Sequence, residues 1–151
     1  MKISLGSDHR GYHLKEKLVA LLATKGHTVD DVGAESADDS VDYPDFAKEV
    51  ASKVGSGEVD RGVLICGTGI GMAITANKFA GVRAAPCSDE VTAEISRRHN
   101  DLNLLCLPAD MLSPRSAERI VDVWVDTEFE GGRHSRRIDK IAGIEKDNSC
   151  C

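Results

Sequence analysis

The amino-acid sequence predicts an α/β fold, namely a single doubly wound domain with a five-stranded parallel sheet, helices on both faces and a C-terminal helix. Short apolar runs alternate with helical patterns along the whole chain, as in repeated βαβ units. The chain has 151 residues, of which 41% are hydrophobic, enough for one sizeable core. No linker, low-complexity segment or internal repeat interrupts the pattern. We therefore expect one domain over residues 1–148 and a mobile tail over residues 149–151.

Five apolar runs predict the strands, and polar or turn residues bound each of them. The runs lie at residues 2–6, 28–32, 62–65, 82–86 and 103–107. By fold precedent we expect the Rossmann-like, flavodoxin-like strand order 2-1-3-4-5, with a switch point between the first and third strands. Ligands of such sheets bind beyond the carboxyl ends of the strands at that point, so the segments after these two strands are candidates for a site.

Helices are predicted between the strands by apolar spacing and by signals at their ends. The first helix should end before Gly26, and the second should begin at Pro44. A later helix should begin at Ser113 and Pro114, a capping serine followed by a proline, and the last near Ser135. One face of the first helix carries four leucines, Leu14, Leu18, Leu21 and Leu22.

Charge and hydropathy exclude several classes of function. The formal net charge of -6 disfavours a general nucleic-acid binder, so an anion that binds here should be small. The first apolar run is too short for a signal peptide, and no run approaches the ~18 apolar residues of a membrane span. We expect a cytoplasmic protein with neither nucleic acid nor a membrane as its partner.

The cysteines and histidines do not form a recognisable metal motif. The chain has no Cys-x-x-Cys pair, which predicts reduced thiols rather than a thiolate metal site. Cys87 and Cys106 end apolar runs and should belong to the core. His9 and His13 have the spacing of a zinc-binding helix, but Arg10 stands where that motif needs glutamate. We expect neither a metal nor a cofactor. The five cysteines are Cys66, Cys87, Cys106, Cys150 and Cys151.

The segment 63–74 is the strongest candidate for a reactive loop. A buried strand is expected to stop at Cys66, and Gly67, Gly69 and Gly71 follow at alternate positions before a helix. Such glycines let a ligand approach the main chain, and the unpaired N–H groups of the helix start attract anions. The same groups stabilise a thiolate, so Cys66 is a candidate base or nucleophile. The alternative is a small buried cysteine in a structural turn.

Three familiar phosphate-binding loops do not fit this segment. The dinucleotide fingerprint needs a glycine three positions after Gly69, where Met72 stands. The P-loop needs a Gly-Lys-Ser/Thr ending, which is absent. A cysteine phosphatase needs an arginine six positions after Cys66, and that residue is again Met72.

A second polar segment, Ser7-Asp8-His9, follows the first strand. Because the first and third strands flank the switch point, we expect this segment to lie beside Cys66. Asp8 has a simpler alternative role as the N-cap of the first helix. An aspartate and a histidine next to a poised cysteine are nevertheless more than capping requires.

Further polar residues follow helices instead of strands, so within one subunit they should lie toward the opposite end of the sheet. These are His99, Asn100 and the cluster that contains Arg133 and Arg137. If they share a site with Cys66, a neighbouring subunit must present them, and we expect a homodimer or a dimer of dimers. Arg133 and Arg137 fall on one helix face, which suits a phosphate, although a solvated face is the alternative.

In these segments the chain resembles the ribose-5-phosphate isomerase B and galactose-6-phosphate isomerase group of sugar-phosphate isomerases. The resemblance spans nearly the whole chain. It rests on Ser7-Asp8-His9, Asp42-Tyr43-Pro44-Asp45, the segment from Ile65 to Gly71, Ala76-Asn77-Lys78, Arg97-Arg98-His99-Asn100-Asp101 and Gly131-Gly132-Arg133-His134.

The resemblance implies a role for each of these segments. In such enzymes a cysteine like Cys66 accepts the proton, a histidine like His99 assists opening of the furanose ring, and a loop like 67–71, with Ile70, holds the enediolate. Thr68 is expected to orient the thiolate or else only to satisfy the helix start. The sites for the substrate and its phosphate are lined, in such enzymes, by residues of both subunits. These residues match Asp8, His9, Tyr43, Asn100, Arg133 and Arg137.

The resemblance implies an enzyme that interconverts ribose 5-phosphate and ribulose 5-phosphate without a cofactor. Two positions leave the substrate open. Arg10 stands where the family commonly has a small residue, and Asp110 stands where ribose-5-phosphate isomerases commonly carry an arginine. Either Arg10 replaces the lost charge, or the pocket suits a tetrose 4-phosphate, allose 6-phosphate or galactose 6-phosphate. A non-catalytic module that binds a phosphorylated metabolite is a remote alternative.

Overall fold

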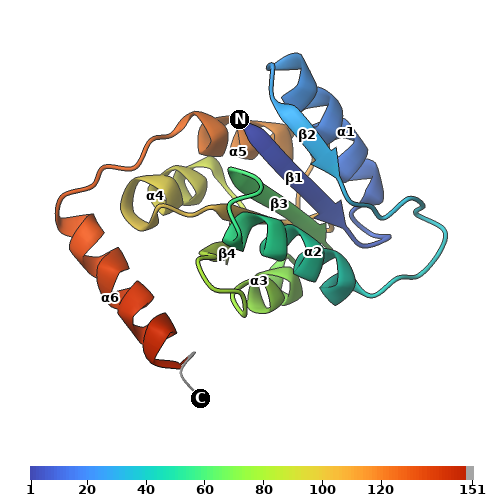
Figure 1. Ribbon diagram of the computed structural model, residues 1–151. Helices are drawn as coiled ribbons and strands as arrows, with labels where there is room; N and C mark the ends of the chain where they lie inside the picture. The colour runs from blue at the N-terminus through green and yellow to red at the C-terminus, as the bar shows by residue number, and fades with distance from the viewer. Residues whose placement is uncertain (149–151) are drawn as a thin grey trace.

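The predicted strands form one all-parallel sheet in the computed structural model, which describes residues 1–148 (Figure 1). The strands are β1 (Lys2–Ser7), β2 (Thr28–Asp31), β3 (Arg61–Cys66), β4 (Ala84–Pro86) and β5 (Leu104–Pro108). The helices are α1 (Tyr12–Thr24), α2 (Tyr43–Gly55), α3 (Ile70–Ala76), α4 (Glu90–Asn100), α5 (Pro114–Asp126) and α6 (Arg133–Asn148). The α/β class, the five parallel strands and the C-terminal helix are therefore confirmed.

The order of the last two strands was predicted wrongly. The observed order is β2-β1-β3-β5-β4, so that β5 pairs with β3 and β4 forms the edge. The reason lies in burial: every residue of β5 is buried, whereas β4 has three residues and is partly exposed. A short, partly exposed strand suits the edge of a sheet. The switch point between β1 and β3 is unaffected.

The ends of the helices follow their expected signals. Gly26 has a φ of +82°, the left-handed conformation that glycine adopts readily after a helix. The Ser113 side chain accepts a hydrogen bond from the Ser116 N–H at the start of α5. The last helix begins at Arg133, two residues before the expected Ser135. These local rules placed the boundaries to within about two residues.

Two hydrophobic cores lie on opposite faces of the sheet. The helices α1, α4 and α5 cover one face, where Leu5, Leu105 and Trp124 are fully buried. The helices α2 and α3 cover the other face, where Leu104 and Met72 are fully buried. Successive residues of a strand point to opposite faces, which is why the neighbours in β5 belong to different cores. The sheet is thus covered on both sides, as an all-parallel sheet requires.

Cys87 and Cys106 lie in these cores, as does Cys66 at the end of β3. Burial raises the pKa of the Cys87 thiol to about 11 and raises the pKa of the Cys106 thiol well above its usual range. Both thiols therefore stay protonated and unreactive near neutral pH, in agreement with the expectation that they are core residues. Cys150, Cys151 and the expected tail 149–151 lie outside the described residues.

The helix α6 lies at the edge of the molecule (Figure 1), where its Glu145 accepts a hydrogen bond from the Gly81 N–H at 2.9 Å. Among its residues, all of which are described, His134 alone is buried, while Ile141 and Ile144 are more than half exposed. Apolar side chains in such a position are available to a second copy of the chain. None of the helices within residues 1–148 has the length and apolar character that crossing a lipid bilayer requires.

Candidate active site

The end of β3 presents Cys66 at the start of α3, as expected. The Cys66 side chain is 5% exposed, and its Sγ accepts a hydrogen bond from the Gly69 N–H at 3.2 Å. Gly69 has a φ of +74°, so this turn requires a residue without a Cβ. The turn therefore aims a main-chain donor at the sulfur, where negative charge on a thiolate would be stabilised.

Two side chains border this loop. The Thr68 Oγ1 accepts a hydrogen bond from the Ile70 N–H at 3.4 Å, which agrees with the simpler role of satisfying the helix start. The ring of Tyr43, at the first position of α2, lies directly over Gly71. A Cβ added to Gly71 would come within 2.5 Å of Tyr43 Cζ, so the glycine makes room for the tyrosine.

The segment after β1 lies beside the segment after β3. The Asp8 N–H donates to the carbonyl of Ile65 at 3.1 Å, which joins the two strand ends. The Asp8 Oδ1 accepts from the N–H groups of Arg10 and Gly11 at 2.9 and 3.0 Å. Asp8 thus stabilises the turn before α1, whose N-cap is Gly11. The His9 Nδ1 accepts from the Val41 N–H at 3.3 Å, and so the neighbouring loop contacts the same segment.

Arg10 and Asp110 form an ion pair above the start of the Cys66 loop. The Arg10 Nε lies 3.3 Å from Asp110 Oδ1, and its Nη2 contacts Oδ2. The Asp110 N–H donates to the Gly67 carbonyl at 3.1 Å. A Cβ on Gly67 would lie 2.6 Å from Asp110 Oδ2, so the pair covers this glycine closely. Each of the two charges is neutralised by the other.

A second group of predicted residues gathers where α4 ends and α6 begins. The rings of His99 and His134 stack with centroids 4.2 Å apart and an interplanar angle of 5°. The Arg133 Nε donates to His134 Nε2 at 3.4 Å. The exposed Asn100 ends α4, and its carbonyl accepts from Arg83 Nε at 3.1 Å. The chain thus brings His99 close to Arg133 through the ring of His134, a neighbourhood that the sequence pattern did not specify.

The two groups are separate within one chain. Among residues 1–148, no hydrogen bond or ion pair joins the Cys66 loop to His99 or Arg133. In Figure 1 the arrowheads of β1 and β3 point away from α4 and α6. This is the opposite-end arrangement that was expected, since helices of a parallel sheet run back toward the start of the strands.

Sequence patterns did not single out Glu130, which lies just before α6. Its Oε2 is 3.8 Å from His99 Nε2 and 3.7 Å from His134 Nε2. These three residues are of the types that bind zinc, and their ligand atoms lie within 4.8 Å of one another. The guanidinium of Arg98 holds the other carboxylate oxygen, which weakens the attraction for a divalent cation. The spacing of four residues between Glu130 and His134 was the available signal.

The electrostatics of this group favour a neutral His134. Burial is the largest cause that lowers its pKa, and the nearby His99, Arg133 and Arg137 lower it further, while Glu130 raises it. Positive charge from the two arginines suits a phosphate better than a metal ion.

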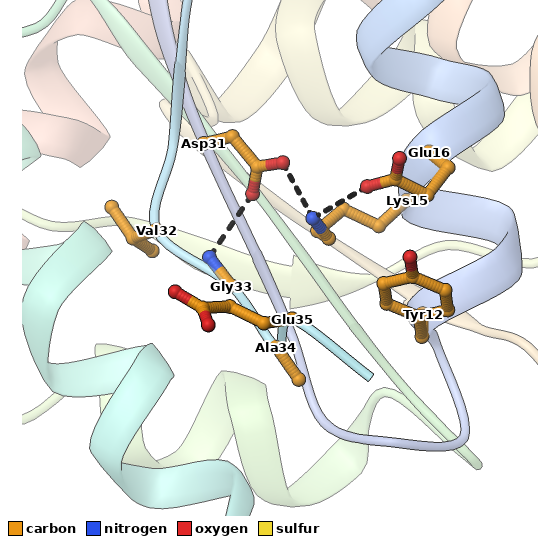
Figure 2. Close-up of a pocket in the computed structure, with 8 residues that line it drawn as sticks. All are labelled: Tyr12, Lys15, Glu16, Asp31, Val32, Gly33, Ala34 and Glu35. Carbon is orange, nitrogen blue, oxygen red and sulfur yellow. Dashed lines mark hydrogen bonds and ion pairs between the residues drawn. The ribbon is translucent and has the colours of Figure 1, made fainter. Parts of the chain in front are cut away.

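A cavity of about 430 Å³ lies elsewhere, beside the end of β2 (Figure 2). Its lining includes Lys15, which is 2% exposed and bonds to Asp31 Oδ2 at 2.5 Å and Glu16 Oε1 at 2.9 Å. Burial alone would lower the pKa of Lys15, but the bonds to Asp31 and Glu16 outweigh it and raise the pKa. Together with Glu35, these carboxylates make the cavity unsuitable for a phosphate. The complete lining is Tyr12, Lys15, Glu16, Asp31, Val32, Gly33, Ala34 and Glu35.

Comparison with known proteins identifies relatives along the whole chain. Residues 3–141 match the family model described as Ribose/Galactose Isomerase. The ribose-5-phosphate isomerase B of Escherichia coli is 47% identical over 145 residues, covering 96% of this chain and 97% of that one. The D-erythrulose-4-phosphate isomerase of Pectobacterium atrosepticum is 38% identical, covering 96% of this chain and 95% of that one.

Solved structures agree with this assignment. The ribose-5-phosphate isomerase B of Clostridium thermocellum matches with a TM-score of 0.95 at 49% identity, covering 98% of this chain and 99% of that one. The enzyme of Mycoplasma genitalium, solved with bound ribulose 5-phosphate, matches with a TM-score of 0.93 at 45% identity and covers 96% of each chain. The fold, the family model and the two relatives lead to one conclusion: the chain belongs to the ribose/galactose isomerase family.

Proposed function

We propose that the protein interconverts ribose 5-phosphate and ribulose 5-phosphate, with Cys66 as the base that moves the proton. Membership of a family of sugar isomerases makes the protein an aldose–ketose isomerase rather than a non-catalytic binding module. The observation that carries the proposed mechanism is the Gly69 N–H aimed at Cys66 Sγ in the turn between β3 and α3. The names of the relatives support ribose 5-phosphate as the substrate.

The proton transfer needs a base and donors for an oxyanion. The Cys66 thiolate takes the proton from C2 of the open-chain aldose, and the electron pair forms the C1–C2 double bond of an enediolate with charge on O1. The thiol then returns its proton to C1, and the proton of the C2 hydroxyl moves to O1, which leaves the ketose carbonyl at C2. Main-chain N–H groups of residues 67–71 stabilise the oxyanion, and such a donor is worth about 3–4 kcal/mol.

Ribose 5-phosphate must open its furanose ring before this transfer. The C1–O4 bond breaks with its electron pair going to O4, which takes up a proton, while the anomeric hydroxyl gives one up. A histidine near neutral pH performs such proton exchange well. We assign this step to His99 because its ring is partly exposed and stacks on His134, which Arg133 contacts.

The separation of the two groups supports a site shared between subunits. In that arrangement one subunit supplies Cys66 and Asp8, while its partner supplies His99, Arg133 and Arg137 in the same positions that they have here. The two arginines, together with His9, hold the phosphate through charge-assisted hydrogen bonds. A two-fold dimer creates two such sites, and a dimer of dimers would preserve them.

The Arg10–Asp110 pair favours a second candidate substrate. Because Asp110 neutralises Arg10, the free chain does not offer the unpaired positive charge that a compensating arginine would supply. A pocket without that charge differs from the pocket of ribose-5-phosphate isomerases, which commonly carry an arginine at the position of Asp110. The Pectobacterium relative is named for a tetrose phosphate, so we carry D-erythrulose 4-phosphate as the alternative substrate, ahead of allose 6-phosphate and galactose 6-phosphate.

Kinetic measurements test both the proposed substrate and the proposed role of Cys66. The purified chain should turn over ribose 5-phosphate with the highest kcat/KM among tetrose, pentose and hexose phosphates. In heavy water, the parent enzyme should place deuterium on the carbon beside the carbonyl. Cys66→Ser should fold normally, and its turnover should be about 10²–10⁴-fold lower, which is the usual contribution of a general base. The buried Cys106→Ser variant controls for loss of a thiol elsewhere. Undiminished exchange in Cys66→Ser would remove this cysteine from the mechanism.

A further inference from the structure

Glu130 is held in one orientation by the end of α4. Its N–H donates to the carbonyl of Arg98 at 3.1 Å, and its Oε1 accepts from Arg98 Nε at 2.6 Å and also contacts Nη2. The remaining guanidinium nitrogen, Nη1, pairs with Glu94 at 3.0 Å. The bond from Arg98 is the largest influence on Glu130 and lowers the pKa of its carboxyl. A fixed, ionised carboxylate therefore directs its second oxygen, Oε2, toward the two imidazole rings.

Only one of the two rings can donate a proton to that oxygen. The Nε2 of His134 accepts a hydrogen bond from Arg133 Nε, so it carries no proton. The lowered pKa of His134, caused first by burial and then by His99 and the neighbouring arginines, agrees with a neutral ring. The Nε2 of His99, 3.8 Å from Glu130 Oε2, is then the nitrogen whose N–H faces the carboxylate.

We propose that Glu130 is a positioning residue that keeps the proton of the neutral His99 ring on Nε2, while the buried, neutral His134 supports that ring from one face. The proposal rests on the proposed ring-opening role of His99. A carboxylate behind an imidazole selects its tautomer and stabilises the positive ring that forms when the other nitrogen takes up a proton. Arg98 acts through Glu130 by fixing the direction of the carboxylate.

The first test compares Glu130→Gln with Glu94→Gln, which removes the other carboxylate partner of Arg98 without facing a histidine. Ribose 5-phosphate must open a ring, but ribulose 5-phosphate cannot form a furanose because its O5 is phosphorylated. We expect Glu130→Gln to reduce kcat/KM for ribose 5-phosphate about tenfold or more, part of the usual 10²–10⁴ of acid–base catalysis. The equilibrium constant fixes the ratio of kcat/KM in the two directions, so the affected step is identified with C2-deuterated ribose 5-phosphate. Its isotope effect on kcat/KM should shrink toward 1 in Glu130→Gln, where ring opening limits the rate, whereas Glu94→Gln should keep the isotope effect of the parent.

The second test reads the His99 tautomer directly. In the parent protein at pH 8, the ¹⁵N chemical shifts of the neutral His99 ring should show the proton on Nε2, and in Glu130→Gln they should show a mixture of tautomers. An isotope effect that does not shrink in Glu130→Gln, or an unchanged tautomer, would overturn the positioning role. If the parent enzyme turns over neither pentose phosphate, the proposed function fails instead, and the tautomer measurement still decides the role of Glu130.

Discussion

The Arg10–Asp110 pair permits a quantitative prediction about stability and substrate binding. Both side chains are more than a third exposed, at 57% and 39%, so solvent screens their attraction. Exposed ion pairs contribute about 0.2–1 kcal/mol, and two parallel contacts place this pair at the upper end. We therefore expect a coupling of about 1 kcal/mol between Arg10→Gln and Asp110→Asn in the free energy of unfolding, or about 2–4 °C in Tm.

The same pair should control affinity for the phosphorylated sugar. Asp110→Asn releases the guanidinium of Arg10 above Gly67, where an unpaired positive charge attracts an anion. If this attraction is of the same size as the lost ion pair, KM falls about fivefold, since 1.4 kcal/mol corresponds to a factor of ten. Arg10→Gln alone should change KM little, because its charge is already neutralised in the parent.

A double-mutant cycle measured at low salt distinguishes an Arg10 that Asp110 neutralises from an Arg10 that replaces the arginine missing at position 110. The assay is steady-state kinetics with ribose 5-phosphate at about 20 mM ionic strength, repeated at high salt, where the benefit of Asp110→Asn should shrink. Strictly additive effects on KM, or a higher KM in Asp110→Asn, would refute the reasoning. A large rise of KM in Arg10→Gln would instead show that Arg10 contacts the phosphate despite its partner.

Three further outcomes are expected. Mixing the inactive variants Cys66→Ala and His99→Ala should restore activity in hybrid dimers; failure with hybrids confirmed by mass spectrometry would contradict the shared site. Gly11→Ala should destabilise the fold by about 1–3 kcal/mol in urea titrations, because its Cβ would lie 2.7 Å from a main-chain oxygen of β3, whereas Gly143→Ala, with open space around it, should not. Because the pKa of His134 is lowered in the folded chain, the unfolded chain protonates this ring at a higher pH than the folded chain does, so stability present above about pH 6.5 is lost as the pH falls. His134→Gln should reduce that loss, and an unchanged pH dependence of the free energy of unfolding would exclude His134 as its cause.

The fold could be read from the sequence because its signals are local. Gly26, Ser113 and Pro114 mark helix ends through main-chain conformations and hydrogen bonds that span a few residues. The positions of β4 and β5 in the sheet depend instead on which of the two strands is buried between two other strands. Both runs are short and apolar, and the difference between Ala84–Pro86 and Leu104–Pro108 becomes decisive only when the sheet is assembled.

The candidate site divides in the same way. Cys66 and its glycines form a continuous motif, and the structure shows the expected turn. The partnership of Arg10 with Asp110 joins residues 100 positions apart, so no spacing rule could indicate it. Glu130 gains its interest only from the stacked rings of His99 and His134, which α4 and the start of α6 bring together.

The opposite-end placement of Cys66 and His99 has a consequence for the kinetic order of the reaction. If the sites exist only between subunits, a folded but dissociated chain has no complete site, and specific activity must fall on dilution below the dissociation constant of the dimer. If the partner also covers the exposed Ile141 and Ile144 of α6, these side chains lose that cover at the same protein concentration. Activity and the thermal stability of α6 should therefore follow one dilution curve, so that the cell's concentration of this chain sets how much of it is an enzyme.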